Sequence, residues 1–343
     1  MKCEQIRSLS FFSVFLFLCF CSSILFAGEK FSLNDFVLYA EKEIKLKKIS
    51  DSVGRVGSNK SIHIKKGKCG TLQGDLRALG KIKNDAEITI AGDVFTNKKV
   101  DDKGTLTVLG SVVENANLSK LTLPAFSFSA GGSNIDVSKN AAKTLDPGSY
   151  GKVKLKDHAE LHLSSGDYYI KEFHAHHNAA ILIDLSKGPI FINVEKKLHV
   201  DKYFEIRIDP LESGTTKDIF INIREKKNVT IKKGSIVRGT IVAPNAEVKF
   251  KDGCQLEGAV YAKKISIDKD VRIRYHDSIP ENRPPVADAG IVQTVYAGNM
   301  VFLEGGSSWI RMAMQSPLAG PLHQYLTAVQ RFCLSPRLRV LLL

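Results

Sequence analysis

Cysteine is scarce in the part of the chain that could use it for disulfide bonds. Four of the six cysteines lie in the first 27 residues or near the C-terminal end, and only Cys69 and Cys254 remain in the body. Two cysteines are too few for a scaffold built on disulfides. They either pair or are buried separately as small apolar side chains. We expect separate burial, because they lie far apart in a chain whose repeats should stack in sequence order.

Catalytic motifs are also missing. The sequence has no Gly-x-Ser-x-Gly elbow, no phosphate-binding loop and no repeated calcium-binding nonapeptide. Hydrolases that cleave sugar chains place paired carboxylates together, whereas Asp184, Asp209 and Asp268 stand singly among outward positions that are mostly lysine. We therefore expect no enzymatic activity and no cofactor. A carbohydrate-active β-helix enzyme, either a polysaccharide lyase or a hydrolase, is the alternative.

Acidic residues are outnumbered by basic ones. The 343 residues include 49 Lys and Arg against 36 Asp and Glu, which gives a formal charge of +13. Such an excess suits anionic polysaccharide, lipid headgroups or nucleic acid equally. It is also compatible with a solvated basic surface that has no partner. We expect an anionic polysaccharide or the cell-envelope surface as partner, and no specific nucleic acid.

The N-terminal segment predicts export. Lys2 and Arg7 precede an apolar run of 17 residues, from Phe11 to Ala27. This pattern predicts a signal peptide over residues 1–27 and a location at the cell surface or outside the cell, with the periplasm as an alternative. The run is close to the shortest that can span a bilayer, so an uncleaved anchor is the other interpretation. After cleavage we expect no transmembrane span.

A short motif recurs along the body: a glycine, a small or acidic residue, then a branched aliphatic residue. Its five copies are Gln73–Ala78, Ala91–Thr96, Leu109–Glu114, Arg238–Ala243 and Glu257–Ala262. The glycines of the first three copies are 18 residues apart, and those of the last two are 19 apart. A period near 20 predicts a parallel β-solenoid, whose coils bury their aliphatic residues only by stacking. Leu76, Val94 and Val112 should form one inward ladder, and glycine should permit corners with positive φ.

Alternation of apolar and charged residues predicts strands through most of the body. It is clearest at Lys152–Lys156, Glu205–Ile208, Val229–Lys232, Val248–Lys251 and Val271–Tyr275. We therefore predict an all-β chain with a solenoid over residues 50–279, interrupted at about Leu118–Asp146. Residues 28–49 are predicted to form a short helical cap, because Phe36, Leu38, Tyr39 and Ile44 have helical spacing. A cap would protect the unpaired edge of the first coil.

Two sets of residues are candidates for binding. We expect seven lysines on the outward faces of strands to be exposed and to contact a polyanion: Lys152, Lys154, Lys156, Lys232, Lys233, Lys249 and Lys251. His174 and His176 would share one strand face and are weak candidates for metal ligands. No cysteine or carboxylate has ligand spacing around them, so we expect polar surface histidines and no metal.

The last coils of the body resemble those of exported bacterial β-helix proteins. The resemblance lies in GTIVAPNAEVKFKDG and LEGAVYAKK, together with LDPGSYGKVKL and SGDYYI nearer the middle, and covers most of Asp35–Asp277. It implies the fold and an exported surface protein, and it carries no catalytic residues that could be transferred to this chain.

NRPPVADAGIVQTVYAGNMVFLEGGSS, at Asn282–Ser308, resembles the opening strands of a PKD domain, an immunoglobulin-like β-sandwich. That family continues with Asp-Pro-Asp-Gly-Asp, but this sequence departs from it at Trp309. A DNA stretch encoding WIRMAMQSP can encode Asp-Pro-Asp-Gly-Asp-Ala-Ile-Thr in another reading frame. We therefore interpret residues 280–308 as a partial PKD-like domain and residues 309–343 as an out-of-frame tail with no selected structure.

These observations favour a structural or adhesive protein of the cell surface, whose lysine-rich face binds polyanionic glycans. Besides the enzyme, one alternative is a polymer-forming scaffold similar to the bactofilins, whose solenoids stack end to end. The predicted signal peptide counts against such a scaffold, because those polymers are mostly cytoplasmic.

Overall fold

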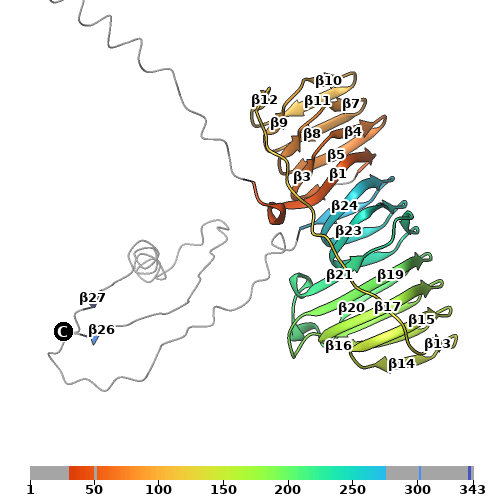
Figure 1. Ribbon diagram of the computed structural model, residues 1–343. Helices are drawn as coiled ribbons and strands as arrows, with labels where there is room; N and C mark the ends of the chain where they lie inside the picture. The colour runs from red at the N-terminus through yellow and green to blue at the C-terminus, as the bar shows by residue number, and fades with distance from the viewer. Residues whose placement is uncertain (1–30, 50–51, 276–300, 303–338, 341–343) are drawn as a thin grey trace, which may run out of the picture. The chain divides into compact units, whose positions relative to one another are not determined.

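The computed structural model describes residues 31–49, 52–275, 301–302 and 339–340, and the chain divides into two units, 1–278 and 279–343. The first unit is a parallel β-solenoid, which confirms the predicted all-β class (Figure 1). Helix among the described residues is limited to three 3-10 turns, η1 (Leu33–Asp35), η2 (Leu211–Ser213) and η3 (Thr216–Asp218). Within the described ranges, no helix is long and apolar enough to cross a membrane.

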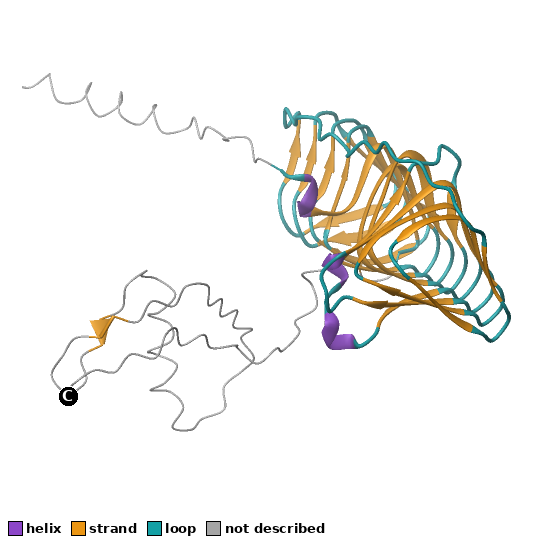
Figure 2. Ribbon diagram, turned by 60° about the horizontal axis from the view of Figure 1, so that its bottom comes forward, coloured by secondary structure: helices purple, strands orange, loops and turns teal. Residues whose placement is uncertain are grey.

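Each coil has three faces, which we name A, B and C in chain order from β1 (Figure 2). Six long strands pass around at least one corner: β1 (Phe36–Lys47), β15 (Gly148–Leu155), β17 (Gly166–Ala175), β19 (Ile190–Val200), β23 (Ile236–Phe250) and β24 (Gln255–Ile267). Face A also contains β3 (Arg55–Ser58), β6 (Leu76–Ala78), β9 (Val94–Thr96), β12 (Val112–Glu114) and β21 (Ile219–Ile223). Face B contains β4 (Ser61–Lys65), β7 (Ile82–Asn84), β10 (Val100–Asp102), β13 (Ile135–Val137) and β22 (Val229–Ile231). Face C contains β2 (Ser52–Val53), β5 (Lys68–Gln73), β8 (Glu87–Ile90), β11 (Thr105–Val108), β14 (Ala142–Leu145), β16 (Glu160–Ser164), β18 (Ala180–Asp184), β20 (Glu205–Ile208) and β25 (Arg272–Arg274).

The coils do not stack in sequence order. The described chain enters in the middle of the stack with β1, and the following coils climb to one end at β12. Residues 115–134, the crossover segment, then lead to β13 at the other end (Figure 1). From there the coils return until β24 pairs in parallel with β1, so that Leu38 lies beside Val260. Residues more than 200 positions apart therefore form the joint in the middle of the solenoid.

The predicted helical cap is wrong. Phe36–Ala40 is a fully buried run, and residues 43–47 then alternate, with Ile44 and Leu46 buried and lysine or glutamate outward. This is the period of two that a strand requires. Three of the four residues behind the apparent helical spacing lie in the fully buried run, and the fourth, Ile44, belongs to the alternating part. With β24 on one side and β3 and β4 on the other, β1 covers no open end.

The inward ladder is confirmed, since Leu76 pairs with Val94 and Val94 with Val112. Val112 is nevertheless 49% exposed, because its coil is the outermost one. We expected the motif glycines to permit corners with positive φ, and this holds only for Gly239 and Gly258, which have φ of 111° and 152°. In the copies near β6, β9 and β12 the glycine is needed because the neighbouring coil approaches too closely for a Cβ.

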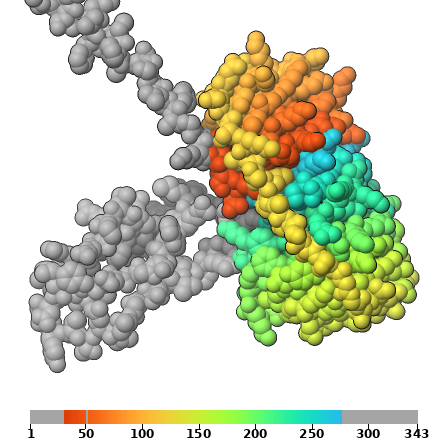
Figure 3. All heavy atoms as spheres, in the orientation of Figure 1, coloured from red at the N-terminus to blue at the C-terminus, as the bar shows by residue number. Residues whose placement is uncertain are grey.

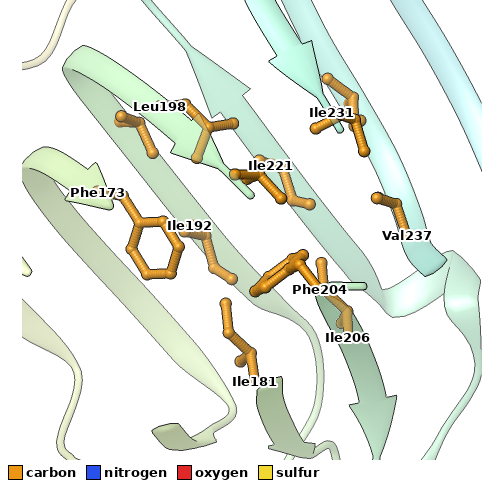
Figure 4. Close-up of a pocket in the computed structure, with 12 residues that line it drawn as sticks. Phe173, Ile181, Ile192, Leu198, Phe204, Ile206, Ile221, Ile231 and Val237 are labelled. Carbon is orange, nitrogen blue, oxygen red and sulfur yellow. The ribbon is translucent and has the colours of Figure 1, made fainter. Parts of the chain in front are cut away.

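The interior is mainly apolar, with a few buried polar side chains such as Asn84 and Thr96, and both body cysteines are free. Between the coils of β17 and β23 it leaves a void of about 30 Å³, lined by apolar side chains that include Phe173, Phe204 and Ile221 (Figure 4). A void of this size without polar lining does not hold ordered water. It is a packing gap of the core and offers no polar group to a ligand.

The second unit has one described element pair, in which β26 (Val301–Phe302) is antiparallel to β27 (Arg339–Val340). The predicted signal peptide lies outside the described residues. So do the partial PKD-like domain and the out-of-frame tail, apart from these two strands.

Candidate functional site

Face A is occupied by the crossover segment, which Figure 3 shows in yellow along the front of the stack. Asn97 and Asn59 each bind both backbone groups of one segment residue. The Asn97 amide donates to the Leu118 carbonyl at 2.9 Å and accepts its N–H, and Asn59 binds Leu121 in the same way at 2.7 and 3.0 Å. The buried Arg77 guanidinium donates to a further carbonyl of the segment. The middle of face A is therefore covered by the chain itself.

Face B carries charged and polar side chains from one end of the stack to the other. Parallel pairing places one outward residue of each coil beside that of the next, in the order Asp136, Lys154, His174, His199, Thr230, Lys249, Ser266, Lys45, His63, Lys83 and Asp101. Side chains on face B alternate with the buried aliphatic residues of the same strands. The period of two thus produces a flat charged surface over an apolar core.

All seven predicted lysines lie on face B or at its corner with face C. Lys233 and Lys251 are exposed, and the other five are half-buried, so the prediction of full exposure holds for two of them. They form two groups rather than one stripe. Lys152, Lys154 and Lys156 follow one another on β15 and the residue after it, and the other four gather at the ends of β22 and β23.

Several of these lysines have acidic partners. Lys156 lies 3.7 Å from Asp136, and Lys249 lies 3.3 Å from Glu247. Lys251 binds Asp268 at 2.8 Å, which raises the pKa of that lysine, and Lys232 forms an ion pair with Asp201. Within the described residues, Lys152, Lys154 and Lys233 have no ion pair. These three ammonium groups are free to meet an anionic ligand.

A hollow of about 410 Å³ lies where the second lysine group meets the corner between faces B and C. Its lining combines four lysines with polar and acidic groups: Lys202, Thr230, Lys232, Lys233, Lys251, Asp252 and Asp268. Three of the predicted lysines line it, namely the consecutive Lys232 and Lys233 and, from the next coil, Lys251. Lys202 was not predicted, because it lies in a turn after β19, where no alternation marks its direction.

Each of the two histidine candidates lies beside a carboxylate. His174 Nε2 lies 3.6 Å from Glu172, and His176 Nδ1 lies 4.0 Å from Asp201. Across the described ranges, no three His, Cys, Asp or Glu side chains are grouped so that they could hold a metal ion. Burial, with Lys152 and other cations nearby, lowers the pKa of His174 to about 4. The ring is therefore neutral at pH 7 and adds no positive charge to face B.

Comparison with known proteins places this architecture in a family. The family described as "Putative Ice-binding-like adhesive domain" matches residues 32–273, which is the solenoid. The chain belongs to this family. The function of the solenoid is therefore adhesive or structural, and adhesion points to an extracellular or surface role.

Three solved structures are similar to this chain at low identity. An ice-binding protein from an Antarctic biological consortium is 13% identical, with a TM-score of 0.32, over 70% of this chain and 88% of the other. One from the Antarctic ascomycete Antarctomyces psychrotrophicus is 11% identical, with a TM-score of 0.32, over 71% and 95%. One from an Antarctic bacterium of the Flavobacteriaceae is 10% identical, with a TM-score of 0.27, over 70% and 97%. No curated protein matches the sequence.

Proposed function

We propose that this protein is an exported, non-enzymatic adhesin that binds anionic polysaccharide through face B. The observation that carries the proposal is the gathering of lysines from several coils on an uncovered, regular surface, with unpaired ammonium groups on β15 and at the corner hollow. Membership in an adhesive family supports the adhesive part. The positive charge supports the anionic class of ligand.

The geometry suits a polymer better than a small molecule. A β-solenoid repeats its outward positions at the strand spacing of about 4.8 Å. Lysines on β15 and lysines near β22 and β23 can therefore contact separate units of one chain. Each exposed contact contributes little, roughly 0–1 kcal/mol. Several contacts along one polymer give useful avidity through high local concentration.

An adhesive rather than catalytic role is supported by the distribution of carboxylates. Asp184 accepts a backbone N–H from Ser186, and Asp268 is paired with Lys251. Asp209 lies at the end of face C, away from the lysine-rich surface. These three carboxylates are therefore not paired with one another in the way that glycoside hydrolysis requires.

The test is binding of the purified protein to immobilised polygalacturonate, with neutral dextran as reference. The double variant Lys152→Gln/Lys154→Gln removes two ammonium groups that have no acidic partner within the described ranges. At roughly 0.5 kcal/mol each, their loss should weaken binding about fivefold. The control Lys143→Gln/Lys187→Gln removes the same charge from exposed positions off face B and should bind as the wild type does.

If both double variants weaken binding equally, the affinity depends only on the overall charge of the protein. That result would overturn the assignment of binding to face B. Ice binding, the activity named for the structural neighbours, is distinguishable because ice carries no net charge. Adsorption to ice that is unaffected by either double variant, together with no binding to polygalacturonate, would replace the proposal.

A further inference from the structure

The corner between faces B and C has one residue with positive φ in each of eight successive coils. Its positions are Asn140, His158, Asn178, Tyr203, Gly234, Gly253, Asp270 and Lys48, in stacking order. Backbone bonds link them. From Asn140 to Gly253, each N–H donates to the carbonyl that precedes the next corner residue, and the Asp270 N–H donates to the Lys48 carbonyl. Glycine, asparagine and aspartate tolerate this left-handed conformation, whereas a bulky residue is strained there.

Two consecutive positions of this column are glycines, and each follows a residue that lines the hollow. The other six positions carry side chains, whereas the Tyr203 ring lies over Gly234 and the corner is open at Gly253. A Cβ on Gly253 would meet no atom within 4 Å, so the space beside it is open. The walls come from the residues next to the glycines, including Lys233 and Asp252.

Tyr203 borders this hollow. It follows Lys202, its N–H binds the Lys233 carbonyl at 3.0 Å, and both lysines line the hollow. Its ring lies against Gly234, where a Cβ would come within 2.6 Å of the ring carbons. The residue has φ of 59°, yet the side chain is 51% exposed. Tyrosine therefore accepts backbone strain here without gaining burial, and strain of this kind is concentrated at functional positions.

We propose that the hollow, with Tyr203 at its rim, binds one acidic sugar unit of the polysaccharide. The exposed tyrosine face packs against the apolar face of the sugar ring. The ammonium groups of Lys202 and Lys233 receive the carboxylate or sulfate of that sugar. This inference rests on the proposed function and adds the ligand unit and its site.

The charges around the hollow support this division of roles. Lys232 and Lys251 are held by Asp201 and Asp268, so they shape the wall. Lys202 and Lys233 are exposed and have no ion pair among the described residues. These two exposed cations lie near an exposed aromatic ring, a combination that suits a ligand with both an anionic group and an apolar ring face.

Three probes separate the possible ligands: oligogalacturonate, a sulfated galactose oligosaccharide, and inorganic polyphosphate, which is a polyanion without a sugar ring. The variant Tyr203→Asn keeps a residue suited to positive φ and removes the ring. We expect its affinity for the acidic oligosaccharide to fall about three- to tenfold, with the affinity for polyphosphate unchanged. If the wild type binds only one of the two oligosaccharides, the anionic group of that oligosaccharide, carboxylate or sulfate, is the one that the site accepts.

Two further variants make the test specific. Gly253→Asn fills the hollow with the residue used at Asn140 and Asn178, so the fold should persist while acidic oligosaccharide binding falls. The matched control His158→Asn makes the same kind of change at the same corner, three coils from Gly234, and should bind as the wild type does. Thermal melting of each variant verifies that it is folded.

The outcomes are distinguishable. If Tyr203→Asn binds both oligosaccharides as the wild type does, while Lys152→Gln/Lys154→Gln still weakens binding, the hollow site is wrong and the proposed function stands. If Tyr203→Asn weakens polyphosphate and sugar binding equally, sugar stacking is wrong. If the wild type binds none of the three probes, the proposed function fails and this site fails with it.

Discussion

Asp75, the acidic residue of the first repeat motif, connects three coils. Its Oδ1 accepts the Asp93 N–H of the next coil at 2.9 Å, and its Oδ2 accepts from Arg55 Nε of the previous coil at 2.7 Å. The same device recurs one coil further, where Asp93 Oδ1 accepts the Ser111 N–H at 2.6 Å. An acidic residue after the motif glycine therefore satisfies a backbone donor that the strands leave unpaired at a corner.

Substitution of this residue by alanine should destabilise the solenoid. Asp75→Ala leaves the N–H of the half-buried Asp93 without its acceptor, which costs about 1–3 kcal/mol. The lost pair with Arg55 adds at most about 1 kcal/mol, because the arginine side chain is 41% exposed. The sum is a loss of about 1–4 kcal/mol in the free energy of unfolding. Asp75→Asn keeps the Oδ1 acceptor and should lose less than about 1 kcal/mol.

Urea unfolding at 25 °C, followed by circular dichroism, measures both variants against the wild type. The reasoning requires a clear gap between the two substitutions. If alanine and asparagine destabilise equally, the bond to the Asp93 N–H is not the important contact. A loss below about 0.5 kcal/mol for alanine would show that water replaces the carboxylate at this corner.

Three further predictions concern packing, pH and the crossover segment. Gly258→Ala would place a Cβ 2.0 Å from the Gly239 carbonyl oxygen, so we expect a loss of at least about 4 kcal/mol, or no folded protein, by thermal melting; a wild-type midpoint would contradict this. The pKa of His174 is lowered to about 4, mainly by burial, so the unfolded chain gains a proton first as the pH falls below about 6.5. Stability should therefore decrease down to about pH 4, and His174→Gln should reduce that decrease in midpoints measured at pH 7, 5 and 4. Asn97→Ala removes both hydrogen bonds to Leu118 and should speed hydrogen exchange of the Leu118 amide while the interior strands remain protected. Unchanged exchange would show that Asn97 does not hold the crossover segment in place.

The repeat motif was enough to predict the solenoid because its physical cause is local. Each coil must place one aliphatic residue inward, so Leu76, Val94 and Val112 carry the same signal at a fixed period. Alternation around Lys152–Lys156 and Val248–Lys251 likewise predicted which lysines face outward. A period of two determines the face of a residue without knowledge of its neighbours.

The order of the coils could not be predicted in this way. Pairing of β1 with β24 depends on contacts between residues more than 200 positions apart. The alternation of apolar and polar residues is similar in all coils, so it does not specify which coil stacks on which. The fully buried run Phe36–Ala40 has no alternation, so its strand could not be distinguished from a helix by period.

The corner hollow was missed for a related reason. Lys202, Lys233 and Asp252 lie in turns of successive coils, and only the stacking of those turns brings them together. The sequence signal that could have found it is the corner residue itself. Gly234 and Gly253 stand where Asn140 and Asn178 stand in other coils, but this equivalence becomes visible only once the corner has been aligned.

The most direct test of the central claim is the salt dependence of the affinity for polygalacturonate. Binding through exposed lysines on face B should weaken steadily between about 50 and 500 mM salt, because the Debye length falls from roughly 14 to 4 Å. The double variant Lys152→Gln/Lys154→Gln should show a shallower dependence than the wild type, because fewer charges take part. An affinity that stays constant over this range, or equal slopes for the two proteins, would contradict a charged adhesive face.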